Sequence, residues 1–327
     1  MERQRIVWLE VQSQAVMDEA NKALPKGFEV VYPKSRTNTE EHTRLIEGAD
    51  YLITQGIYVT GEQLKKARKL KLIQKYGVGV DKIDCKAAEE LNIPVYITAG
   101  ANSIPVSEMT IALMLATNRK LPFVDKAVRA HQWPKAEMSA QCYMLYDKTI
   151  GLVGMGNIGK QVVKRLSGFG VGEILYYDLF RLSIEMETSL GVKYVSLEEL
   201  AVKSDVISIH VPLTDQTKGM ISKELITLMK PTTIIINTAR GFIINQDALV
   251  EALKSGKLRG AGIDAYEEEP VSPNCPLLEL ENVVLTCHHA GSVIDNVLPR
   301  AQHAYGNIEK YSKGEPIDPR DIVVRKK

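Results

Sequence analysis

Long apolar runs are absent from this 327-residue sequence. The longest candidates, Ile111–Ala116 and Ile234–Ile236, fall far short of the roughly 18 residues that a membrane helix needs. The first residues, Met1–Val7, carry early charges and lack the apolar core of a signal peptide. We therefore expect neither a leader segment nor a membrane partner.

Neither sign of charge is in excess, because 41 Lys and Arg face 40 Asp and Glu and the formal net charge is +1. Proteins that bind nucleic acid by neutralising phosphates need surplus basic residues, so we expect no nucleic-acid partner. Cysteine is scarce, and Cys85, Cys142, Cys275 and Cys287 show neither CxxC pairing nor zinc spacing. We expect reduced thiols in a cytoplasmic protein, with no disulfide scaffold and no metal site.

Short apolar runs rich in Val and Ile alternate with segments of helical period along nearly the whole chain. Continuous apolar strands suit parallel sheets covered on both faces, and the alternation implies right-handed crossovers. At roughly 150 residues per domain, we expect two α/β units, the second larger. The expected strands are Ile6–Val11, Phe28–Val31, Tyr51–Thr54, Leu72–Tyr76 and Val95–Ile97, and then Thr149–Val153, Glu173–Tyr177, Val192–Val195, Val206–His210, Thr232–Asn237, Gly260–Ile263 and Val283–Thr286.

The segment Ser103–Thr117 bridges the two expected units. From Met109 onward it is apolar nearly all round, so it must be buried on several sides. Two interpretations stay open: a core helix of one unit, or a helix shared with a second subunit.

A glycine-rich turn lies between the strand Thr149–Val153 and a helix expected over Ile158–Ser167. Gly154, Gly156 and Gly159 form the GxGxxG pattern, which brings backbone close to a pyrophosphate at a helix N-terminus. The next strand ends in Asp178, 178 − 159 = 19 residues after the last glycine. An acid there binds the ribose 2′-OH and repels a 2′-phosphate, although it could also be a helix N-cap. The pattern predicts NAD binding, while the nearby Arg181 leaves NADP open.

Three polar sites follow later strands, where ligands of an open α/β sheet bind. Arg240 could hold a carboxylate, yet such an arginine is often a surface ion pair. Glu269 belongs to an acidic run that could be a solvated loop. His288 and His289 follow the last strand, where hydrogen-bonded structural histidines are common. Their shared position after strands of a dinucleotide-binding unit favours a functional interpretation.

The chain resembles the D-isomer-specific 2-hydroxyacid dehydrogenase family over nearly its whole length. The resemblance rests on several motifs in family order, which are more specific together than any one alone. These motifs are Tyr76–Asp81, Asn102–Glu108, Gly154–Gly159, His210–Gly219, Asn237–Gly241, Asp264–Pro270 and Leu285–His288.

By this resemblance Arg240, Glu269 and His288 take the catalytic positions. Arg240 would bind and polarise the substrate, His288 would act as acid and base, and Glu269 would fix the tautomer of His288 and favour its protonated form. Backbone N–H groups of Val78 and Gly79 would bind the substrate carboxylate. The implied cofactor contacts are Gly154, Gly156, Asn157, Ile158, Gly159, Asp178, Pro212, Thr217, Thr238, Ala239, Asp264 and Gly291, with Asp264 on the nicotinamide carboxamide.

The resemblance also implies two Rossmann-like or flavodoxin-like, doubly wound parallel-sheet domains with a cleft between them. Residues 1–102 and 295–327 would form the substrate-binding domain, and residues 103–294 the NAD-binding domain. A homodimer formed through the inserted domain is expected. Four positions depart from the family: Cys287 replaces a common Pro, Val293 a frequent Thr, Lys82 an Asn or His, and Asp147 a Gly. The replacement of Pro by Cys287 raises the question of whether the backbone orients His288 as it does in the family.

The implied reaction interconverts a 2-keto acid and its D-2-hydroxy acid. Phosphoglycerate enzymes of the family carry an arginine after the strand matching Tyr51–Thr54, whereas Gln55 and Gly56 follow here, and no regulatory domain follows up to Lys327. We therefore expect an uncharged substrate such as glyoxylate, hydroxypyruvate or pyruvate, with 3-phosphoglycerate as the alternative. An NAD-binding corepressor or sensor with little turnover, and a reductase of a non-acid substrate, also stay open.

Overall fold

The computed structural model describes residues 3–326, which divide into two compact units. Unit 1 joins the chain up to Asn102 with the chain from Ser292 onward, and unit 2 is the continuous segment Ser103–Gly291. From the sequence, the return to the first unit is expected at Asp295, three residues later than Ser292. Within the described residues, no helix is long and apolar enough to cross a membrane.

Unit 1 is a sheet in the order β13-β5-β4-β3-β1-β2, parallel except for its edge strand β13, which pairs antiparallel with β5. Its strands are β1 (Gln4–Trp8), β2 (Phe28–Val31), β3 (Tyr51–Thr54), β4 (Leu72–Lys75), β5 (Val95–Tyr96) and β13 (Ile322–Val324). Its helices are α1 (Gln14–Asn21), α2 (Thr39–Glu47), α3 (Gly61–Lys66), α4 (Cys85–Glu90) and α13 (Val297–Lys313), with short 3₁₀ turns at Ile294–Asn296 and Pro319–Asp321.

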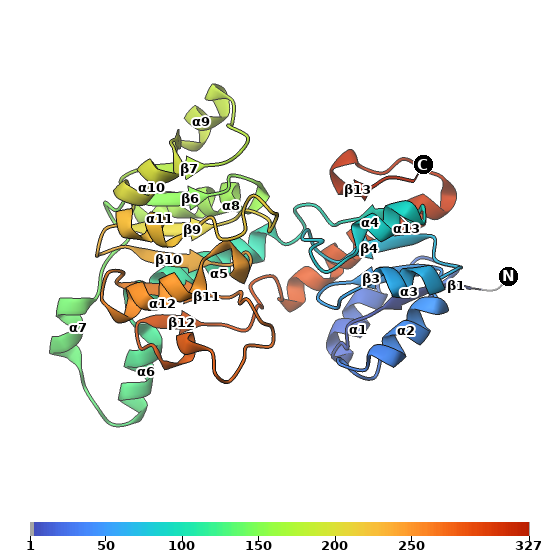
Figure 1. Cartoon of the computed structure of the whole chain (residues 1–327), viewed down its shortest axis with the longest axis horizontal. Helices are drawn as coiled ribbons and strands as arrows, with labels where there is room; N and C mark the ends of the chain where they lie inside the picture. Colours follow the sequence, from blue (N-terminus) through green and yellow to red (C-terminus); the bar gives the residue numbers. More distant parts are fainter. Residues whose placement is uncertain (1–2, 327) are drawn as a thin grey trace. The chain divides into compact units, whose positions relative to one another are not determined.

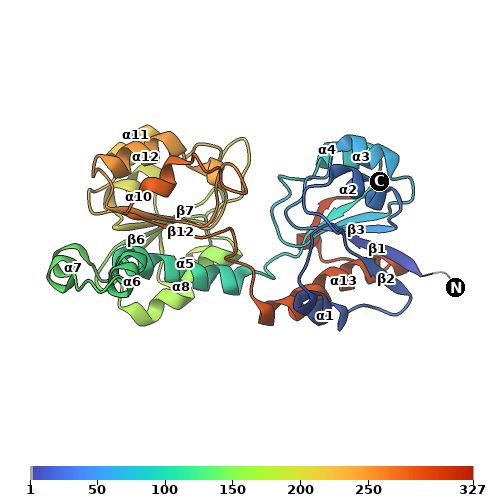
Figure 2. The ribbon, with the colours of Figure 1, turned by 90° about the horizontal axis from the view of Figure 1, so that it is seen from below.

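Both faces of this sheet are covered, because successive strand residues point to opposite sides. Figure 2 shows α2, α3 and α4 on one face and α1 and α13 on the other. In β1, Val7 packs on the side of α2–α4, while Ile6 and Trp8 pack on the side of α13. The continuous apolar strands of the sequence are therefore buried on two sides, as expected for a doubly wound sheet.

Unit 2 is an all-parallel sheet in the order β12-β11-β10-β9-β6-β7-β8. Its strands are β6 (Ile150–Val153), β7 (Ile174–Tyr177), β8 (Lys193–Tyr194), β9 (Val206–Ile209), β10 (Ile234–Asn237), β11 (Gly260–Ile263) and β12 (Val283–Leu285). Its helices are α5 (Ser103–Asn118), α6 (Leu121–Arg129), α7 (Lys135–Gln141), α8 (Asn157–Leu166), α9 (Ile184–Leu190), α10 (Leu197–Lys203), α11 (Lys223–Leu228) and α12 (Gln246–Lys254), with 3₁₀ turns at Ser167–Phe169, Gly241–Ile243 and Pro276–Glu279.

Helices again cover both faces of the second sheet. Figures 1 and 2 show α10, α11 and α12 on one face and α5 and α8 on the other. In β10, Ile235 packs with the first group, and Ile234 and Ile236 pack with the second. The bridging segment forms α5, which packs against α8, β10 and β11 and so acts as a core helix of this unit.

The predicted fold class is confirmed in its main features, and the differences lie at element ends and edges. Several expected strands are shorter, such as β8, which covers Lys193–Tyr194 of the expected Val192–Val195. The antiparallel strand β13 was not predicted, because three residues at a sheet edge give little periodic signal. Helices α6 and α7 fill a stretch for which the sequence pattern gives no separate element bounds.

Candidate active site

The polar residues singled out in unit 2 follow strands that run in the same direction, so they meet at one edge of the sheet. The loops after β6, β7, β10, β11 and β12 carry Gly154, Asp178, Arg240, Glu269 and His288 respectively. The strand order reverses between β6 and β9, which are neighbours in the sheet. Ligands of open α/β sheets bind beside the carboxyl ends of the strands at such a switch point.

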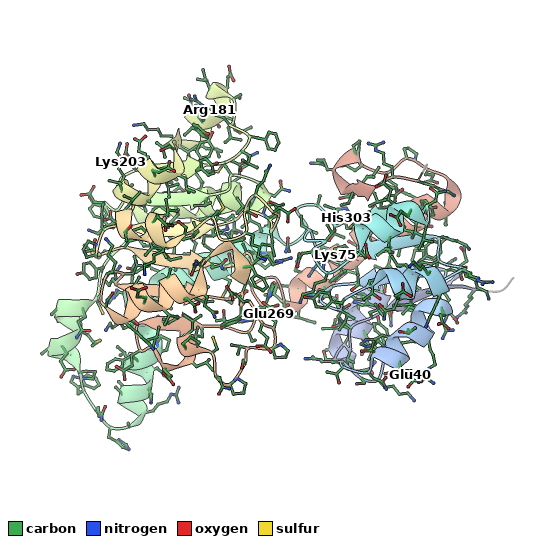
Figure 3. All side chains as sticks on the ribbon, viewed as in Figure 1. Glu40, Lys75, Arg181, Lys203, Glu269 and His303 are labelled. Atoms are coloured by element: carbon green, nitrogen blue, oxygen red, sulfur yellow. The ribbon has the colours of Figure 1, made fainter. Side chains whose placement is uncertain are left out.

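His288 and Glu269 form a close pair across the loops after β12 and β11. Nδ1 of His288 lies 2.6 Å from Oε1 of Glu269, and the side chains are 36% and 22% exposed. The same oxygen accepts the Tyr266 N–H at 3.2 Å, which fixes the carboxylate on its own loop. Figure 3 labels Glu269 on this loop. A carboxylate on Nδ1 assigns the proton to that nitrogen in the neutral ring, and Nε2 is then the nitrogen left for a substrate.

The backbone of His288 has a positive φ of +51°, a conformation uncommon for residues other than glycine. Asp264, which is fully buried, holds the segment around it. Its carboxylate accepts the Thr286 hydroxyl at 2.7 Å and the N–H groups of His289 and Ala290 at 3.0 Å each. These three charge-assisted hydrogen bonds stabilise the turn that carries His288.

Arg240 stands at the end of β10 in extended conformation, directly before a 3₁₀ turn. The buried Asn237 side chain braces this corner, because its amide donates to the Arg240 carbonyl at 2.9 Å and its oxygen accepts the Ala239 N–H at 3.0 Å. The guanidinium donates to the Ala239 carbonyl at 2.8 Å, and the side chain is half-buried. The sheet edge therefore carries a permanently charged donor fork beside the histidine and glutamate loops.

The glycine turn fits a dinucleotide pyrophosphate. Gly154 has φ +103°, and a Cβ there would lie 2.7 Å from the backbone carbon of His210, so only glycine is accommodated. A Cβ on Gly156 would meet no protein atom within 4 Å, so this side of the turn is open. Helix α8 starts at Asn157 without a side-chain cap, which leaves its first N–H groups for an anion.

Asp178 directly follows β7, and its side chain is hydrogen-bonded to the glycine turn after β6. Its Oδ2 accepts the Met155 N–H at 2.7 Å, and its Oδ1 accepts the Phe180 N–H at 3.0 Å. The alternative interpretation as a helix N-cap is wrong, because Ser183 caps α9. The Arg181 side chain forms a bidentate ion pair with Glu187, in which the Nε–Oε1 and Nη2–Oε2 distances are both 2.9 Å.

The remaining expected cofactor contacts lie on the same strand ends, several with side chains already engaged. The Thr217 hydroxyl donates to the Pro212 carbonyl at 2.6 Å and accepts the Thr214 N–H at 2.8 Å. The hydroxyls of Thr238 and Thr110 lie 3.1 Å apart. Through these hydrogen bonds, Thr217 and Thr238 stabilise the loops at the carboxyl-terminal edge of the sheet. The other members of the set lie on the glycine turn and α8 (Ile158 and Gly159) or on the loops after β10 and β12 (Ala239 and Gly291).

In unit 1, the loop expected to bind a carboxylate follows β4. Gly77 donates to the Thr98 hydroxyl oxygen at 2.9 Å, and Val78 is 42% exposed. Arg300 of α13, which was not predicted from the sequence, lies beside this loop. It is 6% exposed, donates to the Tyr76 carbonyl, and stacks 3.9 Å from the Tyr76 ring centroid. Burial lowers the pKa of Arg300 to about 10. A single arginine on a helix gives no sequence signal that it packs beneath this loop.

Metal chemistry has no candidate site in the part of the chain that the structure describes. Within residues 3–326, no group of three or more His, Cys, Asp and Glu side chains is arranged to hold a metal ion.

Comparisons with known proteins find similarity in both sequence and fold. The sequence model described as "D-isomer specific 2-hydroxyacid dehydrogenase, NAD binding domain" matches residues 111–290. A glyoxylate reductase of Korarchaeum cryptofilum is 41% identical over 259 residues, 79% of this chain and 77% of the relative. A D-3-phosphoglycerate dehydrogenase of Methanocaldococcus jannaschii is 42% identical over 293 residues, 89% of this chain but 54% of the relative. The structure of NAD-dependent formate dehydrogenase from Staphylococcus aureus in complex with NAD superposes with a TM-score of 0.86, at 30% identity, over 99% of this chain and 100% of that chain.

Proposed function

The chain belongs to the D-isomer-specific 2-hydroxyacid dehydrogenase family, with NAD as its cofactor, and from this premise we propose that Arg240, Glu269 and His288 carry its reaction. The reaction interconverts a 2-keto acid and the corresponding D-2-hydroxy acid. The observation that carries the proposal is the 2.6 Å contact between His288 Nδ1 and Glu269, at the sheet edge that also bears Arg240 and the glycine turn.

Arg240 binds the substrate and polarises its carbonyl. A 2-keto acid presents a carboxylate and a keto oxygen side by side, and a guanidinium can donate to both. Negative charge grows on the keto oxygen as the carbonyl is reduced, so the hydrogen bond from Arg240 strengthens in the transition state. Backbone N–H groups of Val78 and Gly79 are proposed to bind the carboxylate as well.

His288 transfers the proton that accompanies the reduction. When bound, NAD supplies or accepts the hydride, and the protein contributes position and electrostatics. Glu269 occupies Nδ1, so Nε2 donates a proton to the keto oxygen in reduction and accepts it in oxidation. The carboxylate of Glu269 stabilises the imidazolium and fixes the orientation of its ring.

The cofactor site is proposed to use the glycine turn, the start of α8 and Asp178. The pyrophosphate would lie against the open side of Gly156 and the uncapped N–H groups from Asn157 onward. Asp178 would accept a hydrogen bond from the ribose hydroxyl. Unit 2 is thus proposed as the NAD-binding domain and unit 1 as the substrate-binding domain.

The substrate is proposed to be a 2-keto acid without a charged side chain, such as glyoxylate or hydroxypyruvate. Supporting this, the loop after β3 carries Gln55 and Gly56, and its N–H groups donate to Glu10, with both distances 2.6 Å. Glu10 comes from the loop after β1, and its carboxylate against these N–H groups disfavours a phosphate there. The 42% identity to a phosphoglycerate dehydrogenase keeps 3-phosphoglycerate as the second candidate, although the chain spans about half the length of that relative.

A homodimer and a cytoplasmic location are part of the same proposal. Around α6 and α7, Leu121, Val128 and Trp133 are 53%, 45% and 78% exposed, and exposed apolar residues of this kind favour a surface that a second copy covers. The four cysteines are free thiols, which a reducing compartment preserves. Sedimentation at low concentration tests the dimer.

The decisive experiment follows NADH oxidation with a panel of 2-keto acids, using wild type, His288→Ala and His289→Ala. We expect one or two acids to react, His288→Ala to lose at least about 10²-fold in kcat, and His289→Ala to stay within a few-fold of wild type. Equal rates for His288→Ala and wild type would refute the assignment. NADH binding without turnover of any acid would instead favour a sensor or corepressor.

A further inference from the structure

The only arginine in the loop between Asp178 and the start of α9 is engaged by a glutamate of that helix. In the bidentate pair, Nε of Arg181 donates to Oε1 of Glu187 and Nη2 donates to Oε2, both at 2.9 Å. Glu187 is 9% exposed, and its Oε1 also accepts the Tyr176 hydroxyl at 2.6 Å. The Arg181 guanidinium lies 5.3 Å from the centre of the Tyr194 ring. Figure 3 labels Arg181 at this position.

This arginine is the cation best placed in sequence to meet a 2′-phosphate. It follows Asp178, the acid that would contact the adenosine ribose, by three positions, 181 − 178 = 3. A phosphate ester carries close to two negative charges at neutral pH, and arginine binds such groups bidentately. Whether Arg181 is available to do so therefore bears directly on the choice between NADP and NAD.

We propose that Glu187 is a specificity-determining residue, which holds Arg181 in an ion pair within unit 2 and so withholds it from the 2′-phosphate of NADP. Asp178 disfavours the phosphate directly, and Glu187 removes the one nearby counter-charge in the loop. The inference rests on the assignment of the glycine turn and Asp178 as the NAD site.

The surroundings keep this pair formed. The Arg181 guanidinium and the Tyr176 hydroxyl lower the pKa of Glu187 to about 2, so its carboxylate stays ionised at neutral pH. The Tyr176 hydroxyl also accepts the Leu182 N–H at 2.9 Å, which ties the loop to β7. Ser183 caps α9 and fixes the helix that carries Glu187. To bind a phosphate, Arg181 would have to leave a carboxylate that β7 and α9 hold in position.

Glu187→Gln tests the proposal, because glutamine keeps the shape and the hydrogen-bonding oxygen but removes the charge. Dissociation constants for NADPH and NADH are measured by calorimetry on the full chain without substrate. We expect NADPH to bind about tenfold more tightly than to wild type, the equivalent of one charge-assisted hydrogen bond, while NADH changes less than about twofold. Glu185→Gln, an exposed residue of the same helix, is the matched control for loss of one negative charge.

Two further variants make the test specific to Arg181. In Glu187→Gln/Arg181→Ala, the gain in NADPH affinity should vanish. In Arg181→Ala alone, NADPH affinity should stay within about twofold of wild type, because the arginine is already engaged; this single variant also serves if Glu187→Gln does not fold. An equal gain in Glu185→Gln, a gain that survives in the double variant, or a loss of about fivefold or more in Arg181→Ala would each overturn the proposal. Absence of NADH binding in wild type would instead refute the cofactor site.

Discussion

Replacing Asp264 with asparagine removes the charge that holds the turn carrying His288. The carboxylate is fully buried and accepts hydrogen bonds from Thr286, His289 and Ala290. Asparagine keeps one acceptor oxygen, but its amide nitrogen must face a donor. Hydrogen bonds to a charged group contribute about 1.5–3 kcal/mol each, so weakening two and losing one costs about 2–4 kcal/mol of unfolding free energy.

The kinetic consequence follows from the position of His288. A catalytic group displaced by about 1 Å can cost about 10²-fold in rate, so we expect Asp264→Asn to lower kcat by about 10- to 100-fold. The assays are urea unfolding, NADH oxidation with the best keto acid, and NADH affinity. If the main role of Asp264 is to hold the turn, kcat falls more than NADH affinity does. A larger loss of NADH affinity would favour the expected contact with the nicotinamide carboxamide.

Asp205→Asn is the matched control. Asp205 accepts the Thr149 N–H at 2.9 Å and pairs with Lys230 at 2.9 Å, at the opposite end of the strands from the site. This variant should lose stability and keep its kcat. If Asp264→Asn also loses stability but keeps kcat within about threefold of wild type, the reasoning that this carboxylate aims His288 is refuted.

The other predictions concern backbone positions. Gly156→Ala should fold as stably as wild type, because its methyl group meets no protein atom, but should bind NADH at least about tenfold more weakly; unchanged affinity would exclude a pyrophosphate there. Gly154→Ala should lose several kcal/mol, about 2–4, in urea unfolding, because its methyl group collides with the His210 backbone. Asp147 has φ +57°, so Asp147→Gly should gain about 0.5–1 kcal/mol and Asp147→Ala should lose stability; the reverse order would contradict this assignment of strain.

The departure at Asp147 shows how a sequence difference gains meaning from the backbone. In the sequence alone, aspartate simply stands where the family usually has glycine. The left-handed conformation gives the reason for glycine, and aspartate is among the few other residues that tolerate it. His288 has the same kind of conformation directly after Cys287, which the sequence analysis questions. No pattern of residue types reveals a positive φ at a residue other than glycine.

Local patterns were enough to predict the order of elements and the glycine turn. The run Tyr51–Thr54 has the bounds expected, because a parallel strand buried on both faces is apolar nearly throughout. Phe28–Val31 also has the bounds expected, although this strand lies at the sheet edge and includes the exposed Glu29. Strands at the edges of the sheets were harder to predict. Strand β13 pairs with β5, more than two hundred residues earlier in the chain, and pairing over such a distance leaves no local pattern in the sequence. Helices α6 and α7 had no predicted bounds either, although the apolar residues Leu121, Val124 and Val128 of α6 recur at helical spacing.

The sequence by itself determined the doubly wound fold and the position of the glycine turn, because each depends on residue type and spacing. Arg240, Glu269 and His288 became catalytic candidates through the resemblance to the family, because residue type and spacing alone left other interpretations open for each of them. Only the tertiary structure decided which groups are partners. It placed the Asp264 carboxylate against the turn that carries His288 and paired Arg181 with Glu187. It also brought His288 and Glu269, whose contact the family resemblance implies, to a distance of 2.6 Å. These contacts depend on how separate loops and helices pack, and on burial that makes each ion and hydrogen bond require a partner.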